Sequence, residues 1–421
     1  MLSKAELVLG LTRHVGRYMQ GPERAALGQL EFAGNVLEVS MRLRGSGVST
    51  GSRVRAIAAD AGISARHLTR DVLPTLHSLG WVEIQAPDAT LIAVSEHIPP
   101  LLELIERTDA ILAIAMLEPV ELAVLAILDA TTRMPLTEAT AVNVGATVAS
   151  EQDAYRAIDY LEALNLLERT ISADEGVAVL CNPNVWSSDS DFVTAALRAE
   201  DGKAYEHLGA LIEEIATTPG LPQDSVESTN SEWIDFAVSQ GLIQRSLVVT
   251  SEGRERAFLF TPHMGRSAFG DSVGVDPSGH VRQLIGSMMY AKNFARFKLW
   301  GPRRFLQRMI EDGEAGDASS IKTDYPMLET AGIVRVEPAA KYHKLVLLQS
   351  DVAEQAMLHL QSGGDASTDS ASGLRDQRRY VQPEQERARI RLARQPETSP
   401  AEMDRLMAAV RQTAGSRRFG N

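Results

Sequence analysis

Hydrophobic and polar positions repeat one short signature four times along the chain. Each time, an amphipathic segment with helical spacing ends at a small residue, and an apolar segment with the character of a strand begins at once. Glycine or asparagine just past a helix end favours the left-handed backbone that stops a helix. We therefore predict four helix–strand junctions, at Gly80, Asn165, Gly241 and Gly332.

The segment after each junction has the pattern of a β-hairpin. After Gly80, two short apolar runs, Trp81–Gln85 and Thr90–Val94, flank a turn that contains Pro87 and Asp88. Such turn residues between two strand-like runs predict a hairpin. The same arrangement follows the other three junctions, over residues 166–181, 242–261 and 333–348.

The segments before the junctions have helical patterns. In the first unit, residues 54–61 predict a short helix, Gly62 a sharp turn, and Ser64 the cap of a second helix towards Leu79. In the fourth unit, residues 281–289 carry an apolar helical face, and Pro302 begins the next helix. The second and third units show weaker versions of this order.

The order helix, turn, helix, glycine, hairpin resembles the winged helix-turn-helix superfamily. The resemblance covers four stretches and is closest over residues 54–84, where the spacing of the apolar core positions matches. The resemblance implies a helix-rich α+β fold of tandem winged helix-turn-helix domains, with no catalytic residues. Any α+β protein has some helix–glycine–strand junctions, but four of them, each followed by a hairpin, favour a repeat. The matching core positions are Ile57, Ala58, Gly62, Ile63, Leu68, Val72 and Leu76.

We predict five parts in the chain. The N-terminal helices and winged helix 1 occupy residues 1–98, and winged helices 2, 3 and 4 occupy 99–187, 188–265 and 275–361. Residues 186–191 and 217–231 are polar and rich in turn residues, which is typical of linkers. Residues 362–421 begin with a Gly/Ser/Asp-rich stretch and continue with many arginines, so we expect a flexible, disordered basic tail that orders only on a partner.

Composition excludes several classes of protein. The 421 residues include one cysteine, so neither an intramolecular disulfide nor a multi-thiolate metal site can form. The most apolar window, residues 110–128, contains Glu118, Pro119 and Glu121, which predicts a buried helix split at Pro119 and no membrane span. We see no export signal at the start and expect a cytoplasmic protein.

No enzyme motif survives inspection. The glycine-rich residues 45–52 lack the lysine and the spacing of a phosphate-binding loop, so we interpret them as a turn before the first helix-turn-helix. No histidine pair has metal-ligand spacing, and Cys181 lies in an apolar run typical of a core strand. We expect neither an enzyme nor a bound cofactor or metal.

The strongest functional signal is electrostatic. The net charge is −13, which repels nucleic acid unless a local basic patch is present. Residues 277–310 contain no Asp or Glu, and aromatic residues alternate there with cations that can contact phosphates. The bland alternative is a solvated basic face whose aromatics belong to the core. Candidate residues are Lys292, Arg296, Lys298, Arg303, Arg304 and Arg308, with Lys341 and Lys344 in the fourth hairpin.

A second basic group lies in the first unit, at the start of the helix that a winged helix places in the major groove. Arginine there suits guanine edges or phosphates. The alternative is a helix-turn-helix used for protein contacts, since the hairpin tip Pro87–Asp88 carries no positive charge. Candidate residues are Ser64, Arg66, His67 and Arg70 on this helix, and Arg53 and Arg55 on the preceding one.

The second unit is acidic where a groove-reading helix would lie. Residues 150–164 carry Glu151, Asp153, Asp159 and Glu162, and such a surface is repelled by phosphates. We expect this unit to pack on its neighbours, form a homodimer or bind a protein partner.

Three functional hypotheses follow. The first is a DNA-binding protein that contacts double-stranded DNA and acts as a transcriptional regulator. The second is a winged-helix protein-interaction scaffold in a multi-subunit complex of the chromosome-organising or defence type. The third is a DNA binder that resembles replication initiators. Salt-dependent DNA affinity separates the first and third from the second.

Overall fold

One order of elements occurs four times in a computed structural model of the chain. The structure describes residues 3–18, 21–87, 90–133, 136–171, 178–182, 205–261, 279–296, 298–361 and 377–393. The repeated order runs helix, short strand, two helices and a two-stranded hairpin. In every sheet the strands are antiparallel, and the last strand of the unit lies between the first strand and the second. We call these repeats units 1 to 4; they span residues 28–96, 119–181, 205–260 and 302–347.

The first two units have all their elements within the described residues. Unit 1 holds α3 (Gly28–Leu43), β1 (Val48–Thr50), α4 (Gly51–Asp60), a helix made of α5 (Ala65–His67), π-helical η1 (Leu68–Val72) and α6 (Leu73–Ser78), and the hairpin β2 (Val82–Gln85) and β3 (Ala93–Glu96). Unit 2 holds α9 (Pro119–Arg133), β4 (Leu136–Thr137), α10 (Glu138–Ala146), α11 (Glu151–Ala163), β5 (Glu168–Ile171) and β6 (Ala178–Cys181).

Units 3 and 4 have the same element order. Unit 3 holds η4 (Tyr205–Gly209), α14 (Ala210–Thr217), β7 (Leu221–Pro222), η5 (Gln223–Ser225), α15 (Ser231–Ser239), β8 (Gln244–Thr250) and β9 (Glu255–Phe260). Unit 4 holds α17 (Pro302–Asp312), β10 (Glu314–Ala318), α18 (Ile321–Asp324), α19 (Pro326–Thr330), β11 (Val334–Pro338) and β12 (His343–Leu347).

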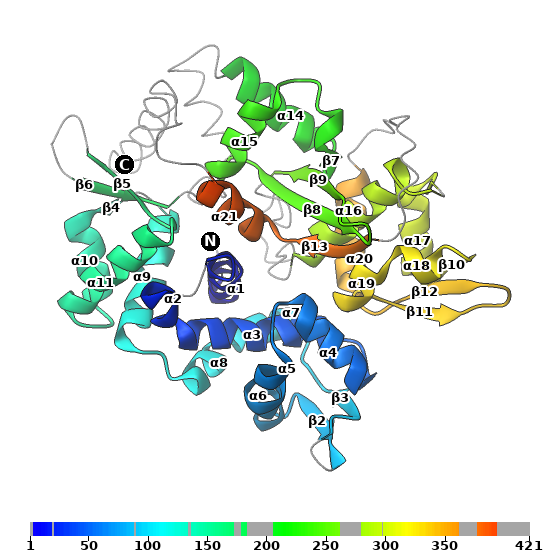
Figure 1. Ribbon diagram of the computed structural model, residues 1–421, viewed down its shortest axis with the longest axis horizontal. Helices are drawn as coiled ribbons and strands as arrows, with labels where there is room; N and C mark the ends of the chain where they lie inside the picture. Colours follow the sequence, from blue (N-terminus) through cyan, green and yellow to red (C-terminus); the bar gives the residue numbers. More distant parts are fainter. Residues whose placement is uncertain are drawn as a thin grey trace.

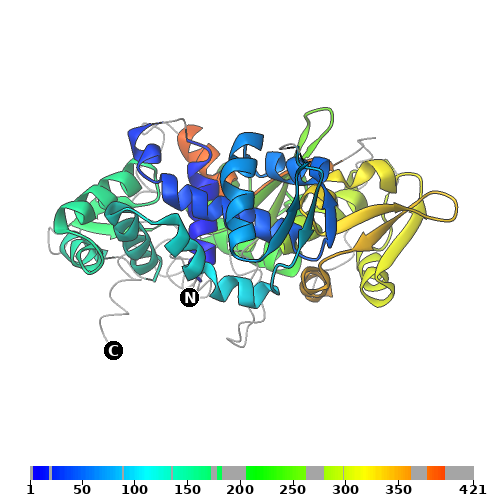
Figure 2. The ribbon, with the colours of Figure 1, turned by 90° about the horizontal axis from the view of Figure 1, so that it is seen from below.

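The remaining elements connect and frame the units. Helix α1 (Lys4–Val15) lies at the centre of the molecule, with the four units arranged around it (Figure 1). A view turned by 90° shows that the molecule has a flattened shape (Figure 2). Helix α1 packs on α3, on α9 and on α21. The others are α2 (Pro22–Ala25), α7 (Leu101–Glu106), α8 (Thr108–Ala115), α16 (His280–Asn293), α20 (Ser350–Gln361), β13 (Gln377–Val381) and α21 (Pro383–Ala393).

The four predicted junctions are confirmed. Gly80, Gly241 and Gly332 have φ angles of 72°, 74° and 72°, and Asn165 has 53°, so all four adopt the left-handed backbone. The four predicted hairpins are also antiparallel pairs. The predicted split at Pro119 is confirmed as well, because α8 ends before it and α9 begins at it.

The leading strand of each unit was not predicted. Strand β1 lies inside residues 45–52, which we had interpreted as a turn, and β7 lies inside residues 217–231, which we had interpreted as a linker. The short helix η5 lies where the sequence offered a short candidate helix, near residues 221–226. Strands of two or three residues carry no alternation that a pattern can detect. Residues 186–191, the other predicted linker, lie outside the described residues.

The predicted flexible tail is wrong over residues 377–393. Strand β13 pairs with β8 and makes the sheet of unit 3 four-stranded, and α21 packs on α1, α15 and β8. The hydrophobic pattern of these residues did not indicate this packing, because part of it comes from a buried ion pair. Glu386 has no exposed surface and contacts Arg245 at 2.8 Å. The rest of the predicted tail, residues 362–376 and 394–421, lies outside the described part.

Polar contacts fix the units relative to one another. Gln349 donates hydrogen bonds to the carbonyls of Met41 and Gly332, which joins the end of α3 to unit 4. Arg391 of α21 donates to the carbonyls of Asn165 and Ser239, which joins units 2 and 3. Within the described residues, no helix is both long enough and apolar enough to cross a membrane.

Candidate functional site

The helix α5–α6 of unit 1 presents two arginines to solvent. The Ser64 side chain accepts a hydrogen bond from the His67 N–H at 3.2 Å and caps the helix. Leu68, Val72 and Leu76 are fully buried, which orients the helix and leaves the opposite face outside. Arg66 and Arg70 are both exposed on that face, one helical turn apart.

The charges on this helix are arranged unequally. His67 Nδ1 lies 2.7 Å from Asp71, one turn along the same helix, and the His67 ring packs edge-on against Phe32 of α3. His67 therefore stabilises this helix and its packing on α3. Among the described residues, neither Arg66 nor Arg70 has an ion pair with a carboxylate. Two unpaired guanidinium groups on one helix face are available to an anionic partner.

The two arginines of α4 have different surroundings. Arg55 is exposed and donates to the Leu91 carbonyl at 3.4 Å. Arg53 is half-buried and faces unit 4: burial lowers its pKa, Glu329 raises it and Arg335 lowers it again. Arg53 therefore lies at the contact between units 1 and 4, where α4 packs on α19, and not beside Arg66.

The corresponding helices of the other units are covered or acidic. In unit 3, α15 packs under α21, and in unit 4, α19 packs on α4 and β13. In unit 2, α11 leaves Glu151, Tyr155 and Asp159 exposed. Among the described third helices, the one in unit 1 thus combines exposure with positive charge.

The basic stretch that precedes and includes α17 divides into core and surface. Tyr290 and Phe294 are buried, at 1% and 3% exposure, as the bland interpretation of the aromatics expects. Trp300 is 93% exposed, directly before the start of α17. Phe297 lies outside the described residues.

The cations of this stretch also divide. Arg303 and Arg304 are exposed in the first turn of α17, and Arg308 is exposed but lies 3.3 Å from Asp312. Three cations near the end of α16 each interact with other groups of the protein. These three are Lys292, Arg296 and Lys298.

The hairpin of unit 4 carries less free charge than its sequence indicated. The Lys344 ammonium pairs with Glu314, and that hydrogen bond raises its pKa. Lys341 is exposed and lies 5.0 Å from the centre of the Tyr342 ring. Asp317, which accepts from the Tyr342 N–H, adds a negative charge beside the hairpin tip.

The structure does not bring the two basic groups together. Helix α5–α6 lies at the lower edge of the molecule and α17 at its right edge, on different sides of α1 (Figure 1). Helix α17 is moreover the first helix of its unit and not the third. The described residues contain no group of three or more His, Cys, Asp or Glu side chains placed to hold a metal ion.

Comparisons with known proteins add no family. No protein-family model and no curated protein sequence matches the chain. The functional interpretation therefore depends on the geometry and charge of the chain itself.

Proposed function

We propose that the chain is a DNA-binding protein of four winged-helix domains that acts as a transcriptional regulator. The repeated order of helices and strands and the strand order in each sheet support the winged-helix assignment. The observation that carries the proposal is the third helix of unit 1, which is exposed and presents Arg66 and Arg70 without carboxylate partners.

The proposed contact is insertion of α5–α6 into the major groove. Arginine binds the acceptor edge of guanine through two hydrogen bonds, and also binds phosphates. The local positive charge opposes the long-range repulsion expected from a net charge of −13. One groove-reading helix covers a short site, so we propose that two copies of the chain read a two-part site.

The surface of Trp300, Arg303 and Arg304 is proposed as a second, sequence-independent contact. Arginines in the first turn of α17 can reach phosphates, and an exposed tryptophan can stack on an unpaired base. Because this surface lies far from α5–α6 around the molecule, it would contact a separate part of the DNA.

Binding to random-sequence duplex DNA across a salt series tests the proposal. We expect the logarithm of the affinity to fall linearly with the logarithm of salt concentration. After selection of a preferred sequence, Arg66→Ala and Arg70→Ala should each cost about 1–3 kcal/mol and relax the preference.

The matched control is Arg156→Ala, which removes an exposed arginine from the third helix of unit 2. We expect no change there, because Arg156 contacts Tyr160 and Asp153 of its own acidic helix. Equal losses in all three variants, or no salt-sensitive binding of the unchanged protein, would contradict the assignment.

A protein-interaction scaffold is the second candidate, and unit 2 favours it. Unit 2 carries the acidic face of α11, and its helix α9 forms an apolar groove of about 530 Å³ with α8. The lining includes Met116, Leu122 and Val148. A stable partner that co-purifies with the chain and is lost in Leu122→Asp, together with absent DNA affinity, would favour the scaffold over the regulator.

A further inference from the structure

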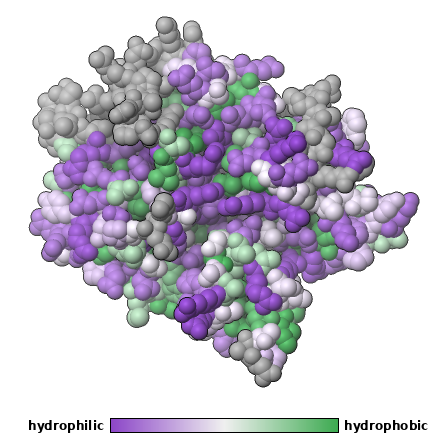
Figure 3. All heavy atoms as spheres, viewed as in Figure 1, coloured by the Kyte–Doolittle hydropathy of each residue, from purple (hydrophilic) through white to green (hydrophobic). Residues whose placement is uncertain are grey.

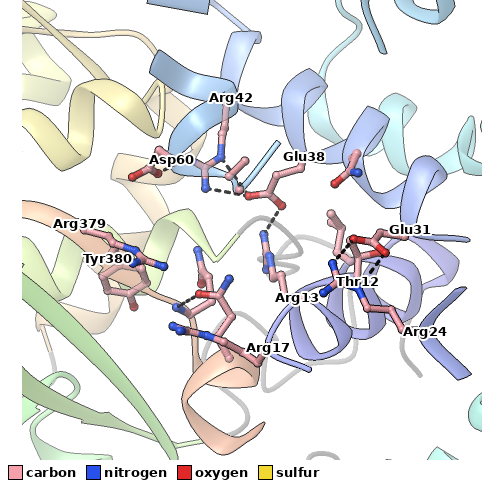
Figure 4. A pocket seen from close by; sticks show the side chains of 17 residues that line it. Thr12, Arg13, Arg17, Arg24, Glu31, Glu38, Arg42, Asp60, Arg379 and Tyr380 are labelled. Atoms are coloured by element: carbon pink, nitrogen blue, oxygen red, sulfur yellow. Dashed lines mark hydrogen bonds and ion pairs between the residues drawn. The ribbon is translucent and has the colours of Figure 1, made fainter. Parts of the chain in front are cut away.

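A polar cavity lies beside the central helix α1, outside both basic groups described above. Its walls come from α1, α3, the turn after α4, and the segment β13–α21 (Figure 4). Its volume is about 170 Å³. Hydrophilic side chains gather on the same face of the molecule (Figure 3).

The cavity has more arginines than carboxylates in its wall. Five arginines line it and only three acids, Glu31, Glu38 and Asp60. All three acids are already engaged. Arg24 contacts Glu31 at 2.6 Å, Glu38 lies between Arg13 at 2.8 Å and Arg42 at 2.9 Å, and Arg42 also pairs with Asp60.

The two remaining arginines are Arg17, just after α1, and Arg379 of β13. Among the described residues, neither forms an ion pair or hydrogen bond with a carboxylate. The Nε atom of Arg17 is buried without a hydrogen-bond partner. Both side chains line the cavity, although they come from opposite ends of the sequence (Figure 4).

The surroundings of Arg17 oppose its positive charge. Burial lowers the pKa of Arg17, and the charge of Arg379 lowers it further, whereas Glu386 and Glu255 offset this only in part. A buried guanidinium nitrogen without a hydrogen-bond partner, within the influence of a second positive charge, is unfavourable unless an anion compensates.

We propose that this cavity binds a small phosphate-bearing anion, held between the guanidinium groups of Arg17 and Arg379. The planar guanidinium donates two parallel hydrogen bonds to phosphate, which makes arginine the preferred partner of that group. The cavity is smaller than the roughly 300–1,000 Å³ of sites for drug-sized ligands, so the anion is one or two phosphate groups with little attached. The amides of Asn35, Gln382 and Gln385 lie in the same wall and can bind the remaining oxygens.

The proposed anion site is separate from the proposed DNA contact but adjoins the segment that leads to the DNA-contacting helix. Asp60, Ala61 and Gly62 in the cavity wall form the end of α4 and the turn that leads to α5. The cavity wall therefore includes the turn that precedes the helix that carries Arg66.

Thermal unfolding of the full chain with sodium pyrophosphate or inorganic phosphate, against sodium chloride at equal ionic strength, tests the proposal. We expect a saturable rise in the melting temperature with pyrophosphate, and a loss of at least about tenfold in its affinity in Arg17→Gln and Arg379→Gln. Without added anion, both variants should melt no lower than the unchanged chain, because each removes a like-charge repulsion. Arg254→Gln, at an exposed arginine of the hairpin of unit 3 that pairs with Glu252, is the matched control and should bind pyrophosphate normally.

Two outcomes overturn the proposal. One is no saturable shift in the unchanged chain up to about 10 mM pyrophosphate, or a shift that both variants retain in full. The other is that neither phosphate nor pyrophosphate shifts the melting temperature while Arg17→Gln weakens duplex DNA binding. The arginines would then contact the DNA backbone instead of a small anion. Failure of Arg66→Ala to affect DNA binding, by contrast, leaves the cavity result unchanged and counts against the DNA contact alone.

Discussion

Arg303 and Arg304 differ from Arg66 and Arg70 in what they can recognise. They lie in the first turn of the first helix of unit 4, next to the exposed Trp300, and not on a groove-reading helix. We expect Arg303→Ala with Arg304→Ala to weaken binding to all duplex sequences alike and to lower the salt slope by about 2, because both arginines would contact phosphates.

The measurement is the same salt series, run on the preferred sequence and on an unrelated one. Arg308→Ala is the control, because Asp312 already offsets the charge of Arg308 and its removal should change the slope less. A change of preference between the two sequences in the double variant would show that this surface reads bases.

Two buried histidines make stability depend on pH. His14 donates from Nε2 to the Leu164 carbonyl at 2.7 Å, and His280 contacts Gln349 at 3.1 Å. Burial lowers the pKa of each to about 3. Between that value and about 6.5, the unfolded chain binds more protons than the folded one, so stability falls as pH falls, by about 1.4 kcal/mol per pH unit for each histidine.

Urea unfolding between about pH 7 and pH 5 measures this dependence. We expect His280→Gln to have a flatter profile, and the exposed His97→Gln to keep the original one. Glu38 does not obscure this window: burial raises its pKa, but Arg13 and Arg42 outweigh burial and lower it to about 2, so its contribution is lost only below about pH 4.5. An unchanged slope in His280→Gln would contradict the assignment of a neutral buried imidazole.

At the scale of a single element, the docking of helix α21 on unit 3 depends on one buried ion pair. Arg245 of β8 contacts Glu386 of α21 at 2.8 Å, and neither side chain is more than 8% exposed. Arg245→Ala leaves Glu386 buried with Arg389 as its remaining partner, so we expect a loss of about 2–4 kcal/mol, near the range for breaking a buried pair.

Arg254→Ala is the matched control for this element. It removes an arginine of the same hairpin that pairs with Glu252 at the surface, where both side chains are about 60% exposed, so the expected cost is below about 1 kcal/mol. Chemical denaturation of both variants provides the comparison. Equal costs would mean that α21 contributes little to the stability of unit 3.

At the scale of the whole molecule, equivalent positions in two units have different constraints. Gly80 and Gly332 both have φ near +72°, but a Cβ on Gly80 meets open space, whereas a Cβ on Gly332 overlaps the carbonyl of Arg42 in α3. We expect Gly80→Ala to cost about 1 kcal/mol from backbone strain alone. Gly332→Ala should cost at least about 3 kcal/mol more, because it also pushes unit 4 away from unit 1.

Calorimetric unfolding checks this difference and reports whether the units still unfold together. A separate, earlier transition in Gly332→Ala would show that the contact between units 1 and 4 maintains their cooperativity. Matching costs at the two glycines would contradict the close approach of Gly332 to α3.

The local signals were readable in the sequence. Left-handed junctions, hairpin turns and apolar helical faces depend on residues a few positions apart, so Gly80, Asn165, Gly241 and Gly332 were predicted before the structure was known. The exposure of Arg66 and Arg70 follows in the same way from the burial of Leu68 and Val72 on the opposite face.

Tertiary structure alone decided which of these signals remain accessible. Arg245 and Glu386 are 141 positions apart, so no pattern showed that residues 377–393 fold onto unit 3 or that α21 covers α15. The position of Arg53 beside unit 4 and the placement of Arg17 and Arg379 in one cavity likewise depend on distant segments. Periodicity and turn chemistry are properties of neighbouring residues. Which helices are covered, which charges form ion pairs and which arginines remain unpaired depend on the segments that the packed core brings together.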